Sequence, residues 1–392
     1  GNSIRKGHIM AYAHGPILVD PSAEEGENPA LATRGRILGG GVARKSRGLG
    51  LLLDHEHQSI RLSQLIGKAI NRRFHTYVDG TRKGVAEPKT DEFIELHLHP
   101  RYQDNVNRYM RVVGSIPVRQ SLLQQQERLA LLESQLLDPV TASSAALRLE
   151  AIGDDEAVAI LEQGAASSDP EVRFYAAEAL AYLDSTAAVT PLARAAIEEP
   201  AFRINALAAL STMEDGAASE ALYAMLKAKS AETRYGAFRS LWTMNADDPR
   251  IRGERLGGKF GYHVLDVDGP PMIHVTSSHR SELVLFGKDH RLKLPLVLDA
   301  GKRIMVNGLS GGEITVSRFA PGEETQQRVV STNVDAVVRA VVELGGQYPD
   351  VVQMLQEANE AGALSSRFRV NALPEPGREV AREGEAESRL DL

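Results

Sequence analysis

Five residues in the first hundred have the types and spacing of metal ligands. Asp54, His55 and His57 lie close together in the sequence, and His97 and His99 alternate as they would on one face of a strand. Imidazole and carboxylate groups bind zinc and other transition metals. Nothing in the sequence brings the two groups together, and His-x-His is common on exposed strands. We therefore expect no metal site.

Other motifs that could carry chemistry do not fit their surroundings. The segment GLSGG at 308–312 matches the nucleophile elbow G-x-S-x-G, which needs a helix directly after the serine. The following EITVSRF alternates like a strand, so we expect a hairpin turn. Gly39, Gly40 and Gly41 lack the Gly-Lys-Ser/Thr of a phosphate loop. Ser278 directly precedes a histidine, but neighbours in the sequence do not make a catalytic triad, because the fold brings the members of a triad together. We predict no catalytic residue, no cofactor and no enzyme.

Composition narrows the class of protein. The chain has 392 residues, of which 43% are hydrophobic and 25% are charged, as in soluble proteins of two or three domains. It has no apolar run long enough for a membrane span. The absence of cysteine excludes disulfides and thiolate metal sites but does not decide the compartment. The start Gly1-Asn2-Ser3 does not look native, so we expect a trimmed terminus and conclude nothing from the missing signal peptide.

Charge is unevenly distributed along the chain. Residues 1–90 hold 14 Lys and Arg against 8 Asp and Glu, a net charge of +6, whereas the remainder holds 31 against 44, a net charge of −13. The basic residues around the glycine cluster are a candidate interface for an anionic partner or for the acidic part of a second copy. They are Arg34, Arg36, Arg44, Lys45 and Arg47. A solvated basic face without a partner remains the alternative. The acidic total and 5% aromatic content argue against a nucleic-acid binder.

Residues 138–250 contain an internal repeat. Four segments begin at Asp138, Asp169, Glu199 and Ser230, which lie 31, 30 and 31 residues apart. Seven residues after each start stands an alanine and eleven residues after it a leucine: Ala145, Ala176, Ala206 and Ala237, then Leu149, Leu180, Leu210 and Leu241. Such offsets are typical of stacked helix pairs that bury their faces against their neighbours, and the pattern resembles HEAT-like repeats. The helix expected over 121–137 would cap the leading edge.

Three repeats also share an arginine four residues after their start. These residues are Arg173, Arg203 and Arg234, and we expect them to form a ladder between repeats and not a ligand site. We interpret residues 120–250 as a HEAT-like module for protein interaction, whose partner the sequence does not identify.

The flanking regions differ in composition from the repeats. Residues 1–119 mix strand-like runs with one helix at 61–74, and residues 251–370 are rich in strands before they end in a helical hairpin. Residues 371–392 carry many charges and few apolar anchors, so we expect a disordered tail. The predicted fold is α+β, a split α+β body made of 1–119 and 251–370 with an all-α HEAT-like α-solenoid inserted at 120–250.

The hairpin is the best-defined element of this pattern. Val334, Val337, Val338, Val341 and Val342 form one apolar stripe at helical period. Two glycines at 345–346 then end the first helix, and the proline at 349 suits the first turn of the second.

This hairpin, with three N-terminal segments, resembles the bacterial flagellar P-ring protein family. The hairpin segment is STNVDAVVRAVVELGGQYPDVVQMLQEANEAGALSSRFRV, and the others are AYAHGPILV, GRILGGGV and LGLLLDHEHQSIRLSQLIGKAINRRF, in the order of the family. The matching hairpin positions are Val337, Val338, Ala340, Leu344, Gly345, Pro349, Asp350, Leu355, Gln356, Ala361, Gly362, Leu364 and Val370. The matching N-terminal positions are Asp54, Ile66, Ala69, Ile70 and Asn71.

The resemblance implies a structural subunit of a periplasmic ring around the flagellar rod. Its expected partners are further copies of itself in a homo-oligomeric ring, the rod and L-ring proteins, and peptidoglycan. The family's ordinary members lack the helical repeats and carry other residues where Val42 and His55 stand, which leaves a lineage-specific variant of the ring possible. The alternative hypothesis is a HEAT-type adaptor or scaffold protein without a flagellar role.

Overall fold

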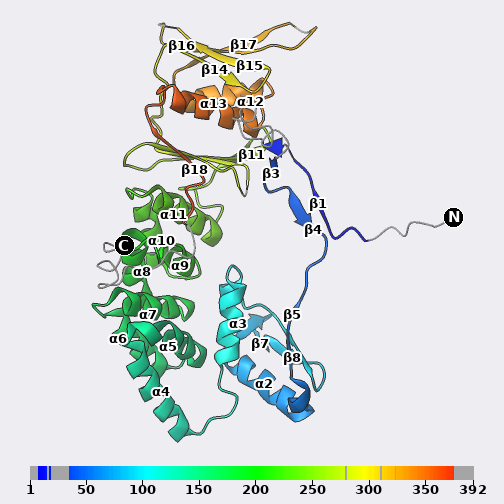
Figure 1. Cartoon of the computed structure of the whole chain (residues 1–392), viewed down its shortest axis with the longest axis vertical. Helices are drawn as coiled ribbons and strands as arrows, with labels where there is room; N and C mark the ends of the chain where they lie inside the picture. Colours follow the sequence, from blue (N-terminus) through cyan, green and yellow to red (C-terminus); the bar gives the residue numbers. More distant parts are fainter. Residues whose placement is uncertain are drawn as a thin grey trace, which may run out of the picture. The chain divides into compact units, whose positions relative to one another are not determined.

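The chain has a mixed α+β fold, as predicted. The computed structural model describes residues 8–15, 17–18, 35–278, 280–309, 311–322 and 324–374 (Figure 1). It divides into two compact units. The strand-rich unit comprises residues 1–46, 226–235 and 245–373, and the helical unit comprises 47–225, 236–244 and 374–392.

This grouping differs from the expected division at residue 119. Residues 47–119 group with the helices and not with 251–370. The reason is that aromatic and charged side chains of 101–115, among them Arg101, Tyr102 and Arg108, contact the repeats, as described below. Their partners are distant in sequence, so local patterns did not reveal the association.

Two sheets form the strand-rich unit. The first has the order β10-β11-β13-β12-β18 and the second is an antiparallel meander, β14-β15-β16-β17. The first consists of β10 (Glu254–Leu256), β11 (Phe260–Leu265), β12 (Met272–Val275), β13 (Glu282–Phe286) and β18 (Arg367–Val370). The second consists of β14 (Leu296–Ala300), β15 (Ile304–Gly308), β16 (Glu313–Arg318) and β17 (Gln326–Ser331). Strand β16, the antiparallel neighbour of β15, follows the GLSGG segment, so a strand and not a helix comes after it, as expected. Ser310 itself lies outside the described residues.

The predicted hairpin lies between these sheets and contacts both (Figure 1). Its helices are α12 (Val334–Glu343) and α13 (Tyr348–Glu360). The Tyr348 hydroxyl donates to the backbone carbonyl of Thr276 at 2.7 Å and accepts from the Thr276 N–H at 3.0 Å, which ties α13 to the first sheet. On the other side α13 packs along β14, where Glu357 accepts the Asp299 N–H at 2.7 Å. The valine stripe of α12 is buried in the common core.

Both glycines of the hairpin turn are required, Gly345 by its backbone conformation and Gly346 by the lack of space for a side chain. Gly345 has φ 98°, a left-handed conformation that costs glycine little. A Cβ at Gly346 would lie 2.6 Å from a methyl carbon of Val341 and 2.7 Å from its carbonyl oxygen. The first helix begins with Asn333 as its N-cap, whose side chain accepts from the Asp335 N–H.

The N-terminal residues of the strand-rich unit form two short antiparallel pairs. Strand β1 (Ala11–Ala13) pairs with β4 (Gly41–Ala43), and β2 (Ile17–Leu18) pairs with β3 (Arg36–Ile37). Leu38 is buried in the core of the unit and Leu18 packs against it, so the second pair is anchored. All six residues of β1 and β4 are exposed.

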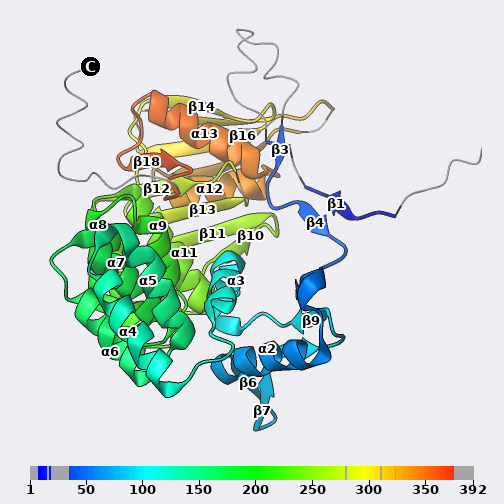
Figure 2. The same ribbon diagram turned by 60° about the horizontal axis from the view of Figure 1, so that its bottom comes forward.

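The helical unit contains a stack of antiparallel helices, in which α4 to α9 are gathered together in Figure 2. They are α4 (Leu122–Leu136), α5 (Pro139–Ile152), α6 (Asp155–Ala165), α7 (Pro170–Tyr182), α8 (Val189–Glu198), α9 (Arg203–Leu210) and α10 (Gly216–Met225); α11 (Ala231–Met244) is divided between the units. All four repeat alanines are fully buried. Asp138 and Asp169 cap α5 and α7 as their positions predict. The third repeat differs, because Glu199 still caps the end of α8 and α9 starts only at Arg203.

Residues 47–119 contribute a small sheet and two helices to the helical unit. The sheet has the order β5-β9-β8, with β5 (Leu49–Leu52), β8 (Ala86–Pro88) and β9 (Phe93–Leu96); β6 (His75–Val78) and β7 (Thr81–Gly84) form a hairpin. Helix α2 (Ile60–Arg73) matches the predicted helix, whereas α3 (Val106–Ser115) was not predicted. The sequence does carry its signature, an Asn105 N-cap followed by Tyr109, Val112 and Val113 on one buried face.

Within the described residues no helix is both long and apolar enough to cross a membrane. The predicted disordered tail, 371–392, is described only as far as Pro374. Its first residues are held by the fold, since Asn371 accepts the Ser277 N–H at 2.7 Å and the Ala372 N–H donates to His274 at 3.0 Å. The remainder lies outside the described residues.

Candidate functional site

The predicted basic interface is exposed where the structure describes it. Arg36 lies on β3, Arg44 and Lys45 directly follow β4, and Arg47 is the first residue of the helical unit. Arg34 lies outside the described residues. Among those that are described, none of the four cations forms an ion pair. The interface role of these residues stays a prediction.

An apolar surface adjoins Arg44 and Lys45. We call residues 8–14 and 40–45 the ribbon, because β1 and β4 form a sheet of only two strands there. Tyr12 is paired with Val42, and the Arg44 N–H donates to the Met10 carbonyl at 2.9 Å. Since side chains alternate along strands, Met10, Tyr12, Val42 and Arg44 share one face. An isolated two-stranded sheet is marginally stable in water, so this exposed apolar face is typical of a surface that becomes covered.

The three repeat arginines join each repeat to the helix before it. Arg173 donates to the carbonyls of residues 167 and 168, just after α6, at 2.8 and 2.9 Å. Arg203 donates to the Ala196 carbonyl in α8 at 3.0 Å, and Arg234 to the Leu226 carbonyl after α10 at 2.8 Å. Carbonyls at helix ends have no partner inside the helix, and a cation there also suits the helix dipole. The arginines are therefore structural links between repeats.

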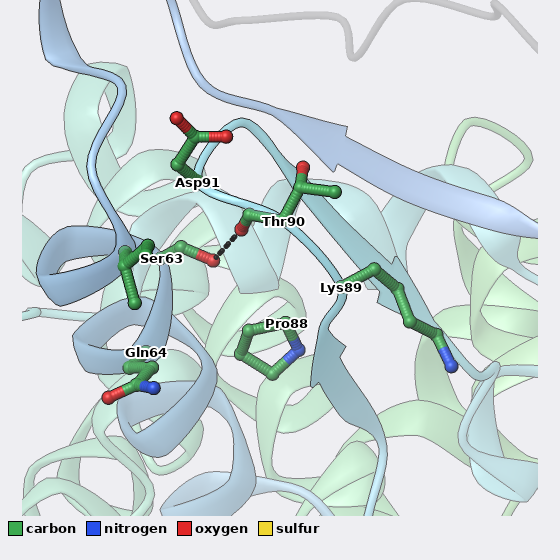
Figure 3. A pocket seen from close by; sticks show the side chains of 7 residues that line it. Ser63, Gln64, Pro88, Lys89, Thr90 and Asp91 are labelled. Carbon is green, nitrogen blue, oxygen red and sulfur yellow. Dashed lines mark hydrogen bonds between the residues drawn. The ribbon is translucent and has the colours of Figure 1, made fainter.

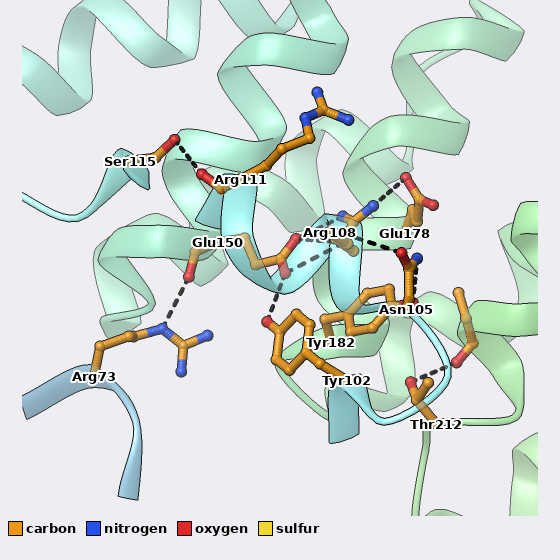
Figure 4. A network of polar contacts seen from close by, with 11 residues as sticks. Arg73, Tyr102, Asn105, Arg108, Arg111, Ser115, Glu150, Glu178, Tyr182 and Thr212 are labelled. Carbon is orange, nitrogen blue, oxygen red and sulfur yellow. Dashed lines mark hydrogen bonds and ion pairs between the residues drawn. The ribbon is translucent and has the colours of Figure 1, made fainter. Parts of the chain in front are cut away.

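A buried polar network connects α3 with the repeats (Figure 4). The Arg108 guanidinium lies between two carboxylates, 2.5 Å from Oε2 of Glu150 in α5 and 2.6 Å from Oε2 of Glu178 in α7. The Tyr102 hydroxyl donates to Glu150 at 2.6 Å. The Tyr182 ring stacks on Tyr102 at 4.8 Å and lies 4.4 Å from the Arg108 guanidinium carbon. The three charges and the Tyr102 hydroxyl thus satisfy one another away from water, and the Tyr182 hydroxyl accepts from the Asn105 side chain at 3.0 Å.

Burial and charge oppose each other in this network. Burial raises the pKa of Glu150, and the guanidinium of Arg108 offsets part of that rise. Burial also disfavours the charged form of Arg108, but Glu150 and Glu178 outweigh it and raise the pKa of the guanidinium. Arg108 is thus held as a cation between two acids. Because the polar groups of these five side chains are occupied by one another or by Asn105, we interpret the network as a structural contact and not as a binding site.

The structure does not assemble the five potential metal ligands considered above. His99 packs between Phe74 and Tyr102, and burial, together with the nearby cations Arg101 and Arg73, lowers the pKa of its imidazole to about 4. His55 and His57 belong to an exposed 3₁₀ turn. In the part of the chain that the structure describes, the group with metal-ligand proximity is a different one, Glu87, Glu95 and His97, whose ligand atoms lie within 4.8 Å of one another.

A lysine already forms ion pairs with both carboxylates of this group. The ammonium of Lys89 lies 2.8 Å from Glu87 and 3.1 Å from Glu95, where a bound cation would have to compete with it. Lys89 lowers the pKa of the Glu87 carboxyl by hydrogen bonding and by its charge. The absence of a metal site remains our expectation, now with a physical reason.

Two pockets are lined by polar side chains. The first, of about 380 Å³, lies against the first turn of α2 and the segment 88–91 (Figure 3). Its Ser63 hydroxyl donates to the Thr90 carbonyl at 2.8 Å, and Lys89 is engaged by its two carboxylates. Neither side chain is thereby arranged as a nucleophile with an adjacent base.

The second pocket, of about 330 Å³, lies in the strand-rich unit beside the Gly-Gly turn. It is lined by the cations Lys302, Arg303 and Arg318 and by the Asp350 carboxyl, whose pKa is raised by burial. Asp350 is occupied as a helix cap, because it accepts the Gln347 N–H at 2.7 Å. The charges of this pocket would suit an anion, but the geometry offers no catalytic group.

Sequence reasoning missed the buried network. Its acids do have a weak sequence marker, since Glu150 and Glu178 interrupt runs of small and apolar residues on helices that are otherwise buried. A carboxylate in such a position requires a partner. Arg108 and Tyr102 could not be chosen as those partners from the sequence, because they lie 42 and 48 residues before Glu150 and no local period links positions so far apart.

One comparison with known families gives a match. Residues 172–198 match the PBS lyase HEAT-like repeat, and in the structure these residues cover most of α7 and all of α8, one helix pair of the stack. No curated protein matches the chain. The chain therefore contains a HEAT-like repeat, a type of element that suggests protein interaction.

Proposed function

We propose that the protein is a structural, protein-binding subunit and not an enzyme. The observation that carries this proposal is the stack of antiparallel helices α4 to α10, of which one pair matches a HEAT-like repeat. By extension of that match, we interpret the whole of 120–250 as a HEAT-like α-solenoid inserted into an α+β chain. Solenoids of this kind offer extended surfaces to other proteins.

The more specific form of the proposal is a ring subunit of the flagellar basal body in the periplasm. Its support is the resemblance of the N-terminal segments and of the hairpin to the P-ring family. Partners would be further copies of the chain, the rod and L-ring proteins, and peptidoglycan. The hairpin residues that carry the resemblance, among them Val337, Val338 and Leu355, are also core residues of the strand-rich unit.

Imaging of purified basal bodies tests the ring proposal. A strain from which this gene is deleted should lack the ring around the rod, and the complemented strain should regain it. If basal bodies of the deletion strain keep a complete ring, the ring proposal is wrong. The HEAT-type adaptor or scaffold without a flagellar role then takes its place, which the HEAT-like match supports equally.

A further inference from the structure

Large exposed apolar side chains gather on two separate surfaces of the described chain. The first is the face of the ribbon that Met10, Tyr12 and Val42 share, where these side chains are between 43% and 59% exposed. The second is the outward side of α4, where Leu123 and Leu131 are 65% and 50% exposed, with Leu137 58% exposed just after the helix. Scattered single residues of this kind are ordinary, but neighbouring ones that share a face mark interaction surfaces.

Helix α4 carries leucines on its outward side as well as on its buried side. Its inner side buries Leu129, Leu132 and Leu136. Leu123 and Leu131 lie on the opposite side, eight residues apart, together with Ala130 and Ser134. The terminal helix of a solenoid normally presents a polar outer face. The outward side of α4, which we call the α4 face, departs from this rule because it exposes Leu123 and Leu131 beside the polar Glu127 and Ser134.

The two surfaces carry opposite charge. Residues 35–53, which include one strand of the ribbon, hold four Lys and Arg and no Asp or Glu. The repeats from 120 to 225 hold 17 Asp and Glu against 5 Lys and Arg, a net charge of −12. On α4 itself Glu127 is exposed on the α4 face and Glu133 is partly exposed at its margin. In the described structure Arg44, Lys45, Glu127 and Glu133 have no ion-pair partner.

We infer that the ribbon of one copy docks on the α4 face of a second copy. The inference rests on the proposed structural role and names its partner. Apolar side chains would meet in the centre of the contact, while Arg44 and Lys45 would face Glu127 and Glu133 at its margin. Because the two surfaces differ, the contact is heterologous, and each copy keeps one free ribbon and one free α4 face. Repetition of the contact builds a closed ring or an open filament, depending on the rotation between neighbours.

Mixing two variants of the full chain tests the inference. The ribbon variant is Tyr12→Ser/Val42→Ser and the α4 variant is Leu123→Lys/Leu131→Lys. All four positions are exposed, so folding should be unchanged, which circular dichroism of each variant checks. In sedimentation equilibrium the unaltered chain should gain mass with concentration, less so as salt rises, whereas each variant alone should stay a monomer. An equimolar mixture should form dimers and nothing larger, since only one of the two possible contacts is intact.

Val297→Lys is the matched control, since Val297 is equally exposed on a different surface. This variant should associate as the unaltered chain does. A monomeric unaltered chain, association by either variant alone, or a mixture that stays monomeric would each overturn the inference. Such a result leaves the ring proposal standing if basal bodies of the deletion strain still lack their ring, so the two failures can be told apart.

Discussion

Arg108 and Glu150 form a bidentate ion pair that joins α3 to α5, with Nη2 2.5 Å from Oε2 and Nε 3.3 Å from Oε1. Both side chains are buried, and 42 residues separate them in the sequence. Removing two charges from water is costly, so such a pair contributes less to net stability than its short distances suggest. What it supplies is a specific attachment of residues 101–115 to the repeats.

Removing the cation from this pair should strongly destabilise the helical unit. Arg108→Met leaves Glu150 and Glu178 buried without their counter-charge, and we expect a loss of about 3–5 kcal/mol. Chemical unfolding of the full chain, followed by circular dichroism, measures the shift. Arg111→Met is the control, because Arg111 is exposed on the same helix and its change should cost little. Equal shifts for the two variants would show that the network contributes nothing specific.

The repeats should depend on the segment that precedes them. A fragment of residues 47–250 keeps the partners of Glu150, whereas 120–250 loses Arg108, Tyr102 and their aromatic neighbours. Both fragments should be helical by circular dichroism, but the shorter one should melt at a clearly lower temperature. If 120–250 melts at the same temperature as 47–250, the repeats are self-sufficient and our interpretation of the network is wrong.

His274 should make the strand-rich unit sensitive to acid. Its ring is fully buried and stacked on Tyr235 at 3.7 Å, its Nε2 accepts the Ala372 N–H, and burial lowers its pKa from 6.5 to about 3. Between about pH 3 and pH 6.5 the imidazole of His274 is therefore protonated in the unfolded chain and neutral in the folded chain. The contribution of the neutral ring to the free energy of unfolding is complete above pH 6.5. It falls as the pH decreases and is smaller by about 2–3 kcal/mol at pH 4.5.

Unfolding free energies at pH 7.5 and pH 4.5 check this expectation. His274→Phe keeps an aromatic ring without a titrating group, so its stability should fall less between the two pH values than that of the unaltered chain. His57→Phe, at an exposed position, should keep the original pH dependence. An unchanged pH dependence in His274→Phe would mean that this histidine is not the acid-sensitive group.

Purified protein should retain no stoichiometric metal, because Lys89 occupies the space between Glu87 and Glu95. Lys89→Met removes this competing charge, and zinc affinity should then rise in titration calorimetry. Elemental analysis of the unaltered protein supplies the decisive comparison. Near-stoichiometric zinc that is lost on His97→Ala would contradict the prediction and make the group a true metal site.

Local patterns in the sequence predicted the mixed α+β fold, the hairpin of α12 and α13, and the caps of α5 and α7. Each of these depends on residues within a few positions of one another, such as Asp138 before Pro139 or the valine stripe before two glycines. Spacing also identified the buried alanines and leucines of the repeats, because helical period determines which residues share a face.

The tertiary structure alone decided which distant segments pack together. The partnership of Arg108 with Glu150 and Glu178, the grouping of 47–119 with the helices, and the proximity of Glu87, Glu95 and His97 all join residues whose separation no local period encodes. The same holds for exposure, since the pattern of α4 predicts a helix but not that Leu123 and Leu131 stay in water. Burial depends on what the rest of the chain covers, and that is a property of the whole fold.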